Sequence, residues 1–174
     1  SQQPPEKPQS LKREVFSLVS VLVLAVTIAF LLRMYVAQAY EIKGRSMEPT
    51  FHDGDRVILL KLAPTLLPIE RGDIVIFSHP KNPDRELVKR VIAKGGDTVT
   101  IVNGIVYVNG RRSPYAGPTY AHGPNAGPWV VPEGAYFVLG DNRENSQDSR
   151  DFGPITHNLV KGKVWFRWWP LWGD

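Results

Sequence analysis

The chain begins with one long apolar run and continues with many short ones. Residues 15–32 are 18 successive positions without a charge. As an α-helix, at about 1.5 Å per residue, this run is ~27 Å long, close to the ~30 Å hydrocarbon core of a bilayer. It is apolar on every face, unlike a surface helix with one buried stripe. The pattern predicts a transmembrane helix over residues 15–36, and the polar, proline-rich residues 1–14 before it are expected to be a disordered tail.

Two other interpretations of this run stay open. A buried core helix would need a second helix to cover it, and the rest of the sequence predicts none. A cleaved signal peptide would account for Lys12 and Arg13 before the run and for Ala37-Gln38-Ala39 after it, which resembles an A-x-A cleavage site. The run exceeds the ~7–15 apolar residues of a usual signal peptide, which favours an anchor. Three cations flank each end, so charge alone does not predict its orientation.

Beyond Val36 the apolar positions recur in short runs rich in β-branched and aromatic residues, separated by turn residues. Asn103-Gly104 between two such runs is a strong signal for a type I′ hairpin. The pattern predicts a mainly β, antiparallel, barrel-like domain over residues 40–174. The predicted strands are 56–60, 73–77, 86–93, 98–102, 105–108, 135–140 and 163–168. Residues 113–134, rich in glycine and proline, are expected to form a surface excursion rather than a central strand.

Composition narrows the chemistry. The chain has no cysteine, which excludes disulfides, cysteine-based zinc sites and a cysteine nucleophile. Its four histidines show no metal-binding spacing. The net charge of +4 comes without a basic-aromatic motif for nucleic acid. We therefore expect no metal, no cofactor and no nucleic-acid partner.

Ser46, in the stretch EIKGRSMEPTF (41–51), is a candidate nucleophile if a base can take its proton. No histidine is marked for this task by its surroundings. A lysine can act as the base when burial lowers its pKa toward 7–8. Lys89 is in an apolar strand pattern, ELVKRVIA (86–93), next to Arg90. Adjacent residues of a strand point to opposite faces, so one of the two cations must face an apolar surface. The alternative is that Lys89 is a protective charge on an edge strand.

A polar stretch, GDNRENSQDSR (140–150), follows directly after a predicted strand. Asn and Asp side chains favour local hydrogen bonds to the backbone, which predicts a structured loop. Ser146, Asp148 and Arg150 in this loop could orient a base and brace it with an ion pair. A solvated turn is the alternative.

Together these segments resemble the type I signal peptidase family of membrane-bound Ser/Lys peptidases. GRSMEPT (44–50) is similar to the nucleophile box of the family, and RGDIVIF (71–77) is similar to a second box. LVKRVIAKGGD (87–97) is similar to the lysine box, and GDNRENSQDSR to the last box. Any one box is a weak signal, whereas four in the right order form a strong one, and the resemblance covers nearly the whole chain.

The resemblance implies a role for each matching residue. Ser46 would attack the scissile carbonyl, and Lys89 would take its proton and later donate it to the leaving amine. Ser146 would hydrogen-bond the Lys89 amine, with an ion pair between Asp148 and Arg150 in support. The Ser46 amide would donate to the oxyanion. Some members have a serine as second donor two positions before the nucleophile. Here that residue is Gly44, which leaves only a backbone or water contribution.

The resemblance also implies the substrate and the location. The family removes signal peptides from exported precursor proteins by cleaving after small residues at −1 and −3, and the substrate would bind by strand addition. The catalytic domain would lie on the non-cytoplasmic side of a plasma or thylakoid-type membrane. The lipid bilayer and the export machinery would be its neighbours. Matching positions for the substrate pocket are Ile42, Ile76, Leu87 and Val88.

Two alternatives to this function remain. One is a related Ser/Lys maturation peptidase with a dedicated substrate, such as a self-cleaving repressor or a pilus-precursor peptidase. The other is a non-catalytic, membrane-anchored β adaptor. The C-terminal tryptophans are a separate question: we expect Trp165 in a strand within the core. For Trp168, Trp169 and Trp172, a patch resting on lipid is about as well supported as a core position.

Overall fold

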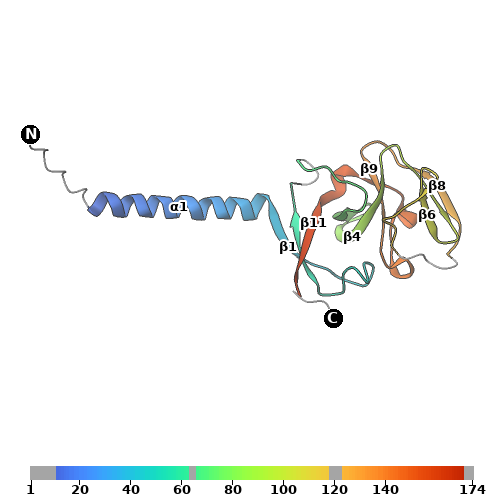
Figure 1. The fold of residues 1–174 in the computed structure, drawn as a ribbon, viewed down its shortest axis with the longest axis horizontal. Helices are drawn as coiled ribbons and strands as arrows, with labels where there is room; N and C mark the ends of the chain where they lie inside the picture. Colours follow the sequence, from blue (N-terminus) through green and yellow to red (C-terminus); the bar gives the residue numbers. More distant parts are fainter. Residues whose placement is uncertain (1–10, 63–65, 118–122, 171–174) are drawn as a thin grey trace, which may run out of the picture. The chain divides into compact units, whose positions relative to one another are not determined.

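The computed structural model describes residues 11–62, 66–117 and 123–170 (Figure 1). The chain divides after Val36 into two units, each of which is described by itself. The first unit contains the helix α1 (Leu11–Tyr35). Residues 13–31 of α1 have a mean hydropathy of 2.5, and none of this stretch is buried. The helix is therefore long and apolar enough to cross a membrane. The predicted tail lies largely outside the described residues.

The second unit is built on a seven-stranded sheet, in the spatial order β1-β2-β11-β3-β4-β9-β10. Every neighbouring pair in it is antiparallel. The prediction of a mainly β, antiparallel domain is therefore confirmed. The strands are β1 (Ala37–Glu41), β2 (Arg56–Leu60), β3 (Ile74–His79), β4 (Asn82–Lys94), β9 (Ala135–Leu139), β10 (Ile155–Thr156) and β11 (Val160–Trp169). The pattern did not predict β1, which contains Ala37-Gln38-Ala39.

A smaller sheet of four strands, in the order β7-β6-β5-β8, follows β4 in the chain. Its strands are β5 (Thr98–Val102), β6 (Ile105–Val108), β7 (Arg111–Arg112) and β8 (Ala126–Val130). The β5–β6 hairpin is confirmed, with positive φ at both Asn103 (49°) and Gly104 (76°), as a type I′ turn requires. The excursion over 113–134 is not wholly irregular, because β8 belongs to it. This strand contains Pro128 and is at the edge of the sheet, where a missing N–H is tolerated.

Three buried clusters hold the β unit together. One joins β4 and β9 to the small sheet, through residues such as Ile92, Val99 and Phe137. A second surrounds the segment after β1 and includes Met47, Val57 and Val164. The third is formed by β3, β4, β9 and β10. The strand β4 contributes to all three clusters, which fixes its position at the centre of the fold.

The expectation that Trp165 is part of the core is wrong. Its exposed fraction is 65%, and Phe166 and Trp169 on the same strand are also exposed. The reason is the pleat of β11, which turns Val164 into the second cluster and the next side chain outward. Trp168 is partly buried, and its indole N–H has no partner within the described residues. Trp172 lies outside them.

Two short turns of helix complete the loop after β9. They are a 3₁₀ turn, η1 (Arg143–Asn145), and α2 (Ser149–Phe152). Asp148 caps α2, where its side chain accepts a hydrogen bond from the Arg150 amide, and the Asp151 side chain in turn accepts one from the Asp148 amide. A second 3₁₀ turn, η2 (His157–Leu159), leads into β11. The polar stretch 140–150 is thus a structured loop.

Candidate active site

Ser46 is in the turn between Ile42 and Phe51, which follows β1. The turn is anchored by Met47, which is fully buried, and by Phe51, whose amide donates to the Met47 carbonyl. Both side chains belong to the second buried cluster. Ser46 itself is only partly buried. A fixed backbone with an accessible hydroxyl is the arrangement that a nucleophile needs.

Lys89 projects toward this hydroxyl from the middle of β4. Its Nζ atom is 2.8 Å from Ser46 Oγ and 2.8 Å from the Val88 carbonyl oxygen. The exposed fraction of Lys89 is 2%, among the lowest in the β unit. Two residues 43 positions apart in the sequence therefore meet at hydrogen-bond distance. An amine this close can accept the proton of the hydroxyl when it is neutral.

The surroundings of Lys89 favour its neutral form. Burial lowers the pKa of the Lys89 amine from 10.5 to about 8, and the positive charge of Arg85 acts in the same direction. The carboxylates of Asp148 and Asp141 oppose this shift and raise the pKa. Desolvation of a cation is the dominant cause, because the ammonium loses its hydration without gaining a carboxylate partner. The Lys89 side chain is thus prepared for proton transfer near neutral to mildly basic pH.

The loop after β9 is joined to the backbone of Ser46. The amide of Asn142 donates to the Ser46 carbonyl at 3.0 Å. Gly140 makes this approach possible, because a Cβ atom there would be 2.6 Å from the same carbonyl oxygen and would collide with the Ser146 side chain. A glycine is needed here for space rather than for its φ angle. The nucleophile and the loop are therefore positioned together.

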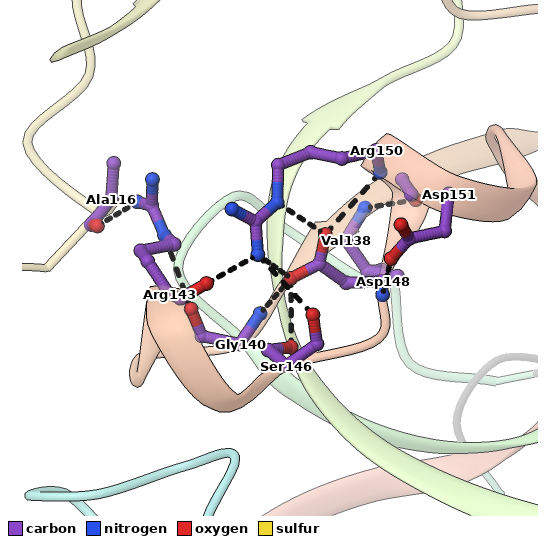
Figure 2. Close-up of polar contacts among 9 residues, drawn as sticks. Ala116, Val138, Gly140, Arg143, Ser146, Asp148, Arg150 and Asp151 are labelled. Carbon is purple, nitrogen blue, oxygen red and sulfur yellow. Dashed lines mark hydrogen bonds and ion pairs between the residues drawn. The ribbon is translucent and has the colours of Figure 1, made fainter. Parts of the chain in front are cut away.

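Asp148 is the centre of the loop, as Figure 2 shows. It is fully buried and accepts hydrogen bonds from the Gly140 amide (3.0 Å), the Ser146 hydroxyl (2.7 Å) and the Arg150 guanidinium (2.8 Å). The expected ion pair between Asp148 and Arg150 is present. Ser146 was expected to bond Lys89, but its hydroxyl donates to Asp148 instead. Lys89 makes its side-chain hydrogen bonds, within the described part of the chain, to Ser46 and Val88.

The two expected oxyanion donors differ in this structure. Within residues 11–62, 66–117 and 123–170, the Ser46 amide donates no hydrogen bond, so it is available to an oxyanion. The Gly44 amide donates to Asp53 Oδ1 at 2.6 Å. Gly44 has a φ of 83°, a conformation that favours glycine over serine. The backbone of Gly44 is thus already engaged.

A groove of about 850 Å³ extends from Ser46 and Lys89 between two stretches of chain. One wall is formed by β1 and residues 43–46, and the other by residues 84–89 of β4. Of the four expected pocket residues, Leu87 and Val88 line the groove. Ile42 and Ile76 are almost completely buried in the second cluster, which also contains Val88. No cluster of three or more possible metal ligands occurs in the described part of the chain.

The pattern did not predict a second polar cluster beside the site. The Arg90 guanidinium binds Asp141 through two hydrogen bonds, of 2.8 and 2.6 Å, and Thr50 Oγ1 donates to the same carboxylate at 2.5 Å. Arg90 also donates to the Gly72 carbonyl at 2.9 Å. The cluster joins the nucleophile turn, β4 and the loop after β9. The Lys89-Arg90 pair was a usable signal, because adjacent strand residues face opposite sides and a partly buried arginine is stabilised by a carboxylate partner.

The comparisons with known proteins identify the family of this chain. The model of the family "Signal peptidase, peptidase S26" matches residues 15–169. The chain belongs to this family. A signal peptidase IB of Staphylococcus aureus (strain COL) is 39% identical to it over 92% of this chain and 93% of the relative. A signal peptidase I of Bacillus licheniformis is 36% identical over 95% of each. A solved signal peptidase I from Enterococcus faecalis V583 is 32% identical, with a TM-score of 0.48, and covers 56% of this chain and 97% of its own.

Membership of the signal peptidase family makes the chain a serine endopeptidase. The match begins within α1 and ends within β11, so it includes the helix, the turn of Ser46, the strand of Lys89 and the loop 140–150. The last three of these segments, all in the β unit, are the ones that the structure brings together. The resemblance deduced from four sequence boxes is therefore confirmed at the level of the family.

Proposed function

We propose that this chain is a membrane-anchored signal peptidase that uses Ser46 as nucleophile and Lys89 as general base. The observation that carries the proposal is the 2.8 Å distance between Lys89 Nζ and Ser46 Oγ, with the lysine buried and unpaired with any carboxylate of the described chain. A structural lysine on an edge strand would be exposed or ion-paired. A lysine with a pKa lowered to about 8 beside a hydroxyl has the properties of a base.

The reaction would proceed in two halves. Ser46 Oγ attacks the carbonyl carbon of the scissile bond while the neutral Lys89 amine takes the hydroxyl proton. The oxyanion accepts a hydrogen bond from the Ser46 amide, a contact of a kind commonly worth about 3 kcal/mol in the transition state. The Lys89 ammonium then donates its proton to the leaving amine. In the second half, Lys89 takes a proton from water, the hydroxide cleaves the acyl ester, and Lys89 returns the proton to Ser46.

The loop 140–150 would hold Ser46 and Lys89 in position relative to each other. Asp148 positions Ser146 and fixes the Gly140 amide, while Gly140 permits the close approach of the Ser46 carbonyl. The negative charge of Asp148 also limits how far the pKa of Lys89 falls. We propose Ser146, Asp148 and Arg150 as positioning residues. A rotation of the Ser146 side chain toward Lys89 would complete the arrangement expected from the family.

The substrate would bind in the groove as an extended strand. β1 is an edge strand, paired with β2 alone, and the pairing of β4 with β9 begins only at Arg90. Both walls of the groove therefore present unpaired backbone, which suits strand addition. Leu87 and Val88 would form the shallow pockets for small side chains at −1 and −3, with Ile42 and Ile76 closing them from behind.

The helix α1 would anchor the enzyme in the membrane across which precursors are exported, with the β unit on the non-cytoplasmic side, next to the export machinery. Signal peptides are themselves apolar and membrane-inserted, so anchoring raises the effective concentration of enzyme and substrate at one surface. The exposed aromatic side chains Trp165, Phe166 and Trp169 on β11 are compatible with contact to lipid headgroups.

Cleavage of a precursor that carries an A-x-A site tests this function. The full-length protein, purified in detergent, is compared with Ser46→Ala and Lys89→Ala. The wild type should release the mature protein, whereas both variants should be inactive. A variant of an exposed lysine on the same strand, Lys94→Ala, is the control and should cleave normally. Equal cleavage by all four proteins, or by none, would contradict the proposal, and the latter result would favour a non-catalytic adaptor.

A further inference from the structure

The groove contains a charged residue, Arg85, that has no role in the proposed catalytic steps. Arg85 is on β4, four positions before Lys89, and lines the groove. The pairing of β4 with β3 is irregular between Asn82 and Glu86, and Arg85, within this bulge, lines the same groove as Leu87 and Lys89. Arg85 is exposed, and this half of β4 is not covered by β9. The guanidinium therefore lies along the path of an extended substrate.

Most other charges around the groove are neutralised by an ion pair or lie on the opposite wall. Glu86 pairs with Lys161 at 2.8 Å, and Arg45 pairs with Glu48 at 3.1 Å. Arg85 donates to the uncharged Gln147 at 2.9 Å and has no carboxylate partner within the described ranges. The remaining groove charges are Asp84, next to Arg85 on β4, and Glu41 and Lys43 on the wall formed by β1 and the residues after it.

The charge of Arg85 also reaches the base. The charged groups that act on Lys89 are Asp148 and Asp141, which raise its pKa, and Arg85, which lowers it. The first two belong to the loop after β9, and Asp141 is paired with Arg90. Arg85 is the member of this set that an incoming substrate can contact. The groove therefore links what the substrate carries to the protonation of Lys89.

We propose that Arg85 is a substrate-recognition residue that selects an acidic side chain about four residues from the scissile bond. This proposal rests on the proposed function and names the charge that the same groove prefers. Paired strands rise by the same ~3.3 Å per residue, so a substrate residue level with Arg85 is about four residues from the one that meets Ser46. On the side of the bond that fills the pockets at −1 and −3, this is position −4 or −5.

An Asp or Glu at that position would replace Gln147 as the partner of Arg85. A Lys or Arg there would be repelled. Ion pairs at an exposed site are worth up to about 1 kcal/mol, so the preference for an acidic over a neutral side chain should be roughly threefold. The difference between acidic and basic side chains, which adds attraction to repulsion, should be roughly tenfold in kcat/KM at low salt and smaller at high salt.

The test uses three peptides that share an A-x-A site and differ only in Glu, Gln or Lys at −4, with a second set varied at −5. Full-length enzyme in detergent is compared with Arg85→Gln and Arg85→Glu. The wild type should prefer Glu over Lys in one of the sets, Arg85→Gln should discriminate weakly, and Arg85→Glu should prefer Lys. Arg111→Gln, on the small sheet and outside the groove, should behave as the wild type. An unchanged preference in Arg85→Glu in both sets would overturn the proposal.

A pH profile with the Gln peptide separates recognition from a structural effect. Cleavage requires neutral Lys89, so the rate rises as the pH passes through the lysine pKa. Removing Arg85 removes an influence that lowers this pKa, and the acid limb of Arg85→Gln should move to higher pH, whereas Arg85→Lys should retain the limb. A lower rate at every pH with an unmoved limb would assign Arg85 a structural role and refute the coupling.

The outcome is distinguishable from failure of the proposed function. The Gln peptide reports cleavage without any contribution from charge at the varied position. If the wild type cleaves it and Ser46→Ala does not, the peptidase activity stands, and the comparison of charged peptides then decides the role of Arg85 alone.

Discussion

The cations in the two halves of β4 have different kinds of partner. In the second half, residues 90–94, Arg90 pairs with Asp141 and Lys94 pairs with Glu70. In the first half, residues 82–89, the cations face uncharged partners: Arg85 donates to Gln147, and Lys89 contacts Ser46 and Val88. The halves also differ in pairing, because β9 covers only the second. We propose that the second half stabilises the fold and that the first half binds the substrate.

This difference explains how the pKa of a lysine can be lowered enough for the lysine to act as a base. A carboxylate in contact with Lys89 would favour its charged form. Burial without such a contact makes the charged form costly, and the amine loses its proton more readily. The carboxylates of Asp148 and Asp141 act from a distance and only moderate the shift. On the proposed function, the absence of an ion pair at Lys89 is what allows it to act as the base.

The largest expected difference between the two halves comes from placing an arginine in each. Lys89→Arg keeps the positive charge but cannot become neutral near pH 8, since the pKa of arginine exceeds 12. Cleavage should fall by at least ~100-fold, the lower range for loss of a general base. Lys94→Arg should leave kcat/KM unchanged. Substantial activity in Lys89→Arg, measured with a precursor peptide, would show that Lys89 is not the base.

Asp148→Asn tests the moderating carboxylate. The substitution removes the charge of a buried carboxylate that pairs with Arg150, which should lower the free energy of unfolding by about 3 kcal/mol. Since Asp148 raises the pKa of Lys89, the acid limb of the pH–rate profile should also move to lower pH, with a rate roughly tenfold lower on the plateau. Glu70→Gln is the control in the paired half and should move neither quantity. A limb that stays in place would show that Asp148 has only a structural role.

Lys89→Met tests the cost of burying the Lys89 amine through the free energy of unfolding. The folded-state pKa of Lys89 is below that of an unfolded lysine, so the unfolded state binds more protons between pH 8 and 10.5, and stability rises with pH there. Below pH 8 the buried amine costs up to about 3 kcal/mol. Lys89→Met should therefore be inactive yet more stable than the wild type at pH 7, with the difference vanishing above pH 10.5. Denaturant unfolding at both pH values measures this, and a less stable variant at pH 7 would contradict it.

Much of the fold and of this site could be predicted from local sequence patterns. The alternation around Lys89 indicated a cation facing an apolar surface, and the structure buries it. Asn103-Gly104 specified its hairpin through local backbone preference. The polar composition of 140–150 predicted a structured loop. These are local properties, and a sequence displays them directly.

What depends on tertiary packing could not be predicted in this way. The meeting of Ser46 with Lys89 depends on β4 crossing behind the nucleophile turn, which no local pattern encodes. Ile42 and Ile76 matched pocket positions, but the second cluster encloses them. Trp165 looked like a core residue by its type, and only the register of β11 shows that Val164 takes the inward position. The partner of Ser146 is likewise set by the loop geometry around Asp148.

The most direct test of the account is the titration of Lys89 itself. The full-length protein, labelled with carbon-13 at the lysine side chains, is followed by NMR from pH 6 to 11, and Lys89→Met assigns the signal. We predict that the Lys89 signal titrates near pH 8. A Lys89 signal that titrates above pH 10 would contradict the assignment of Lys89 as the base of the Ser46 nucleophile.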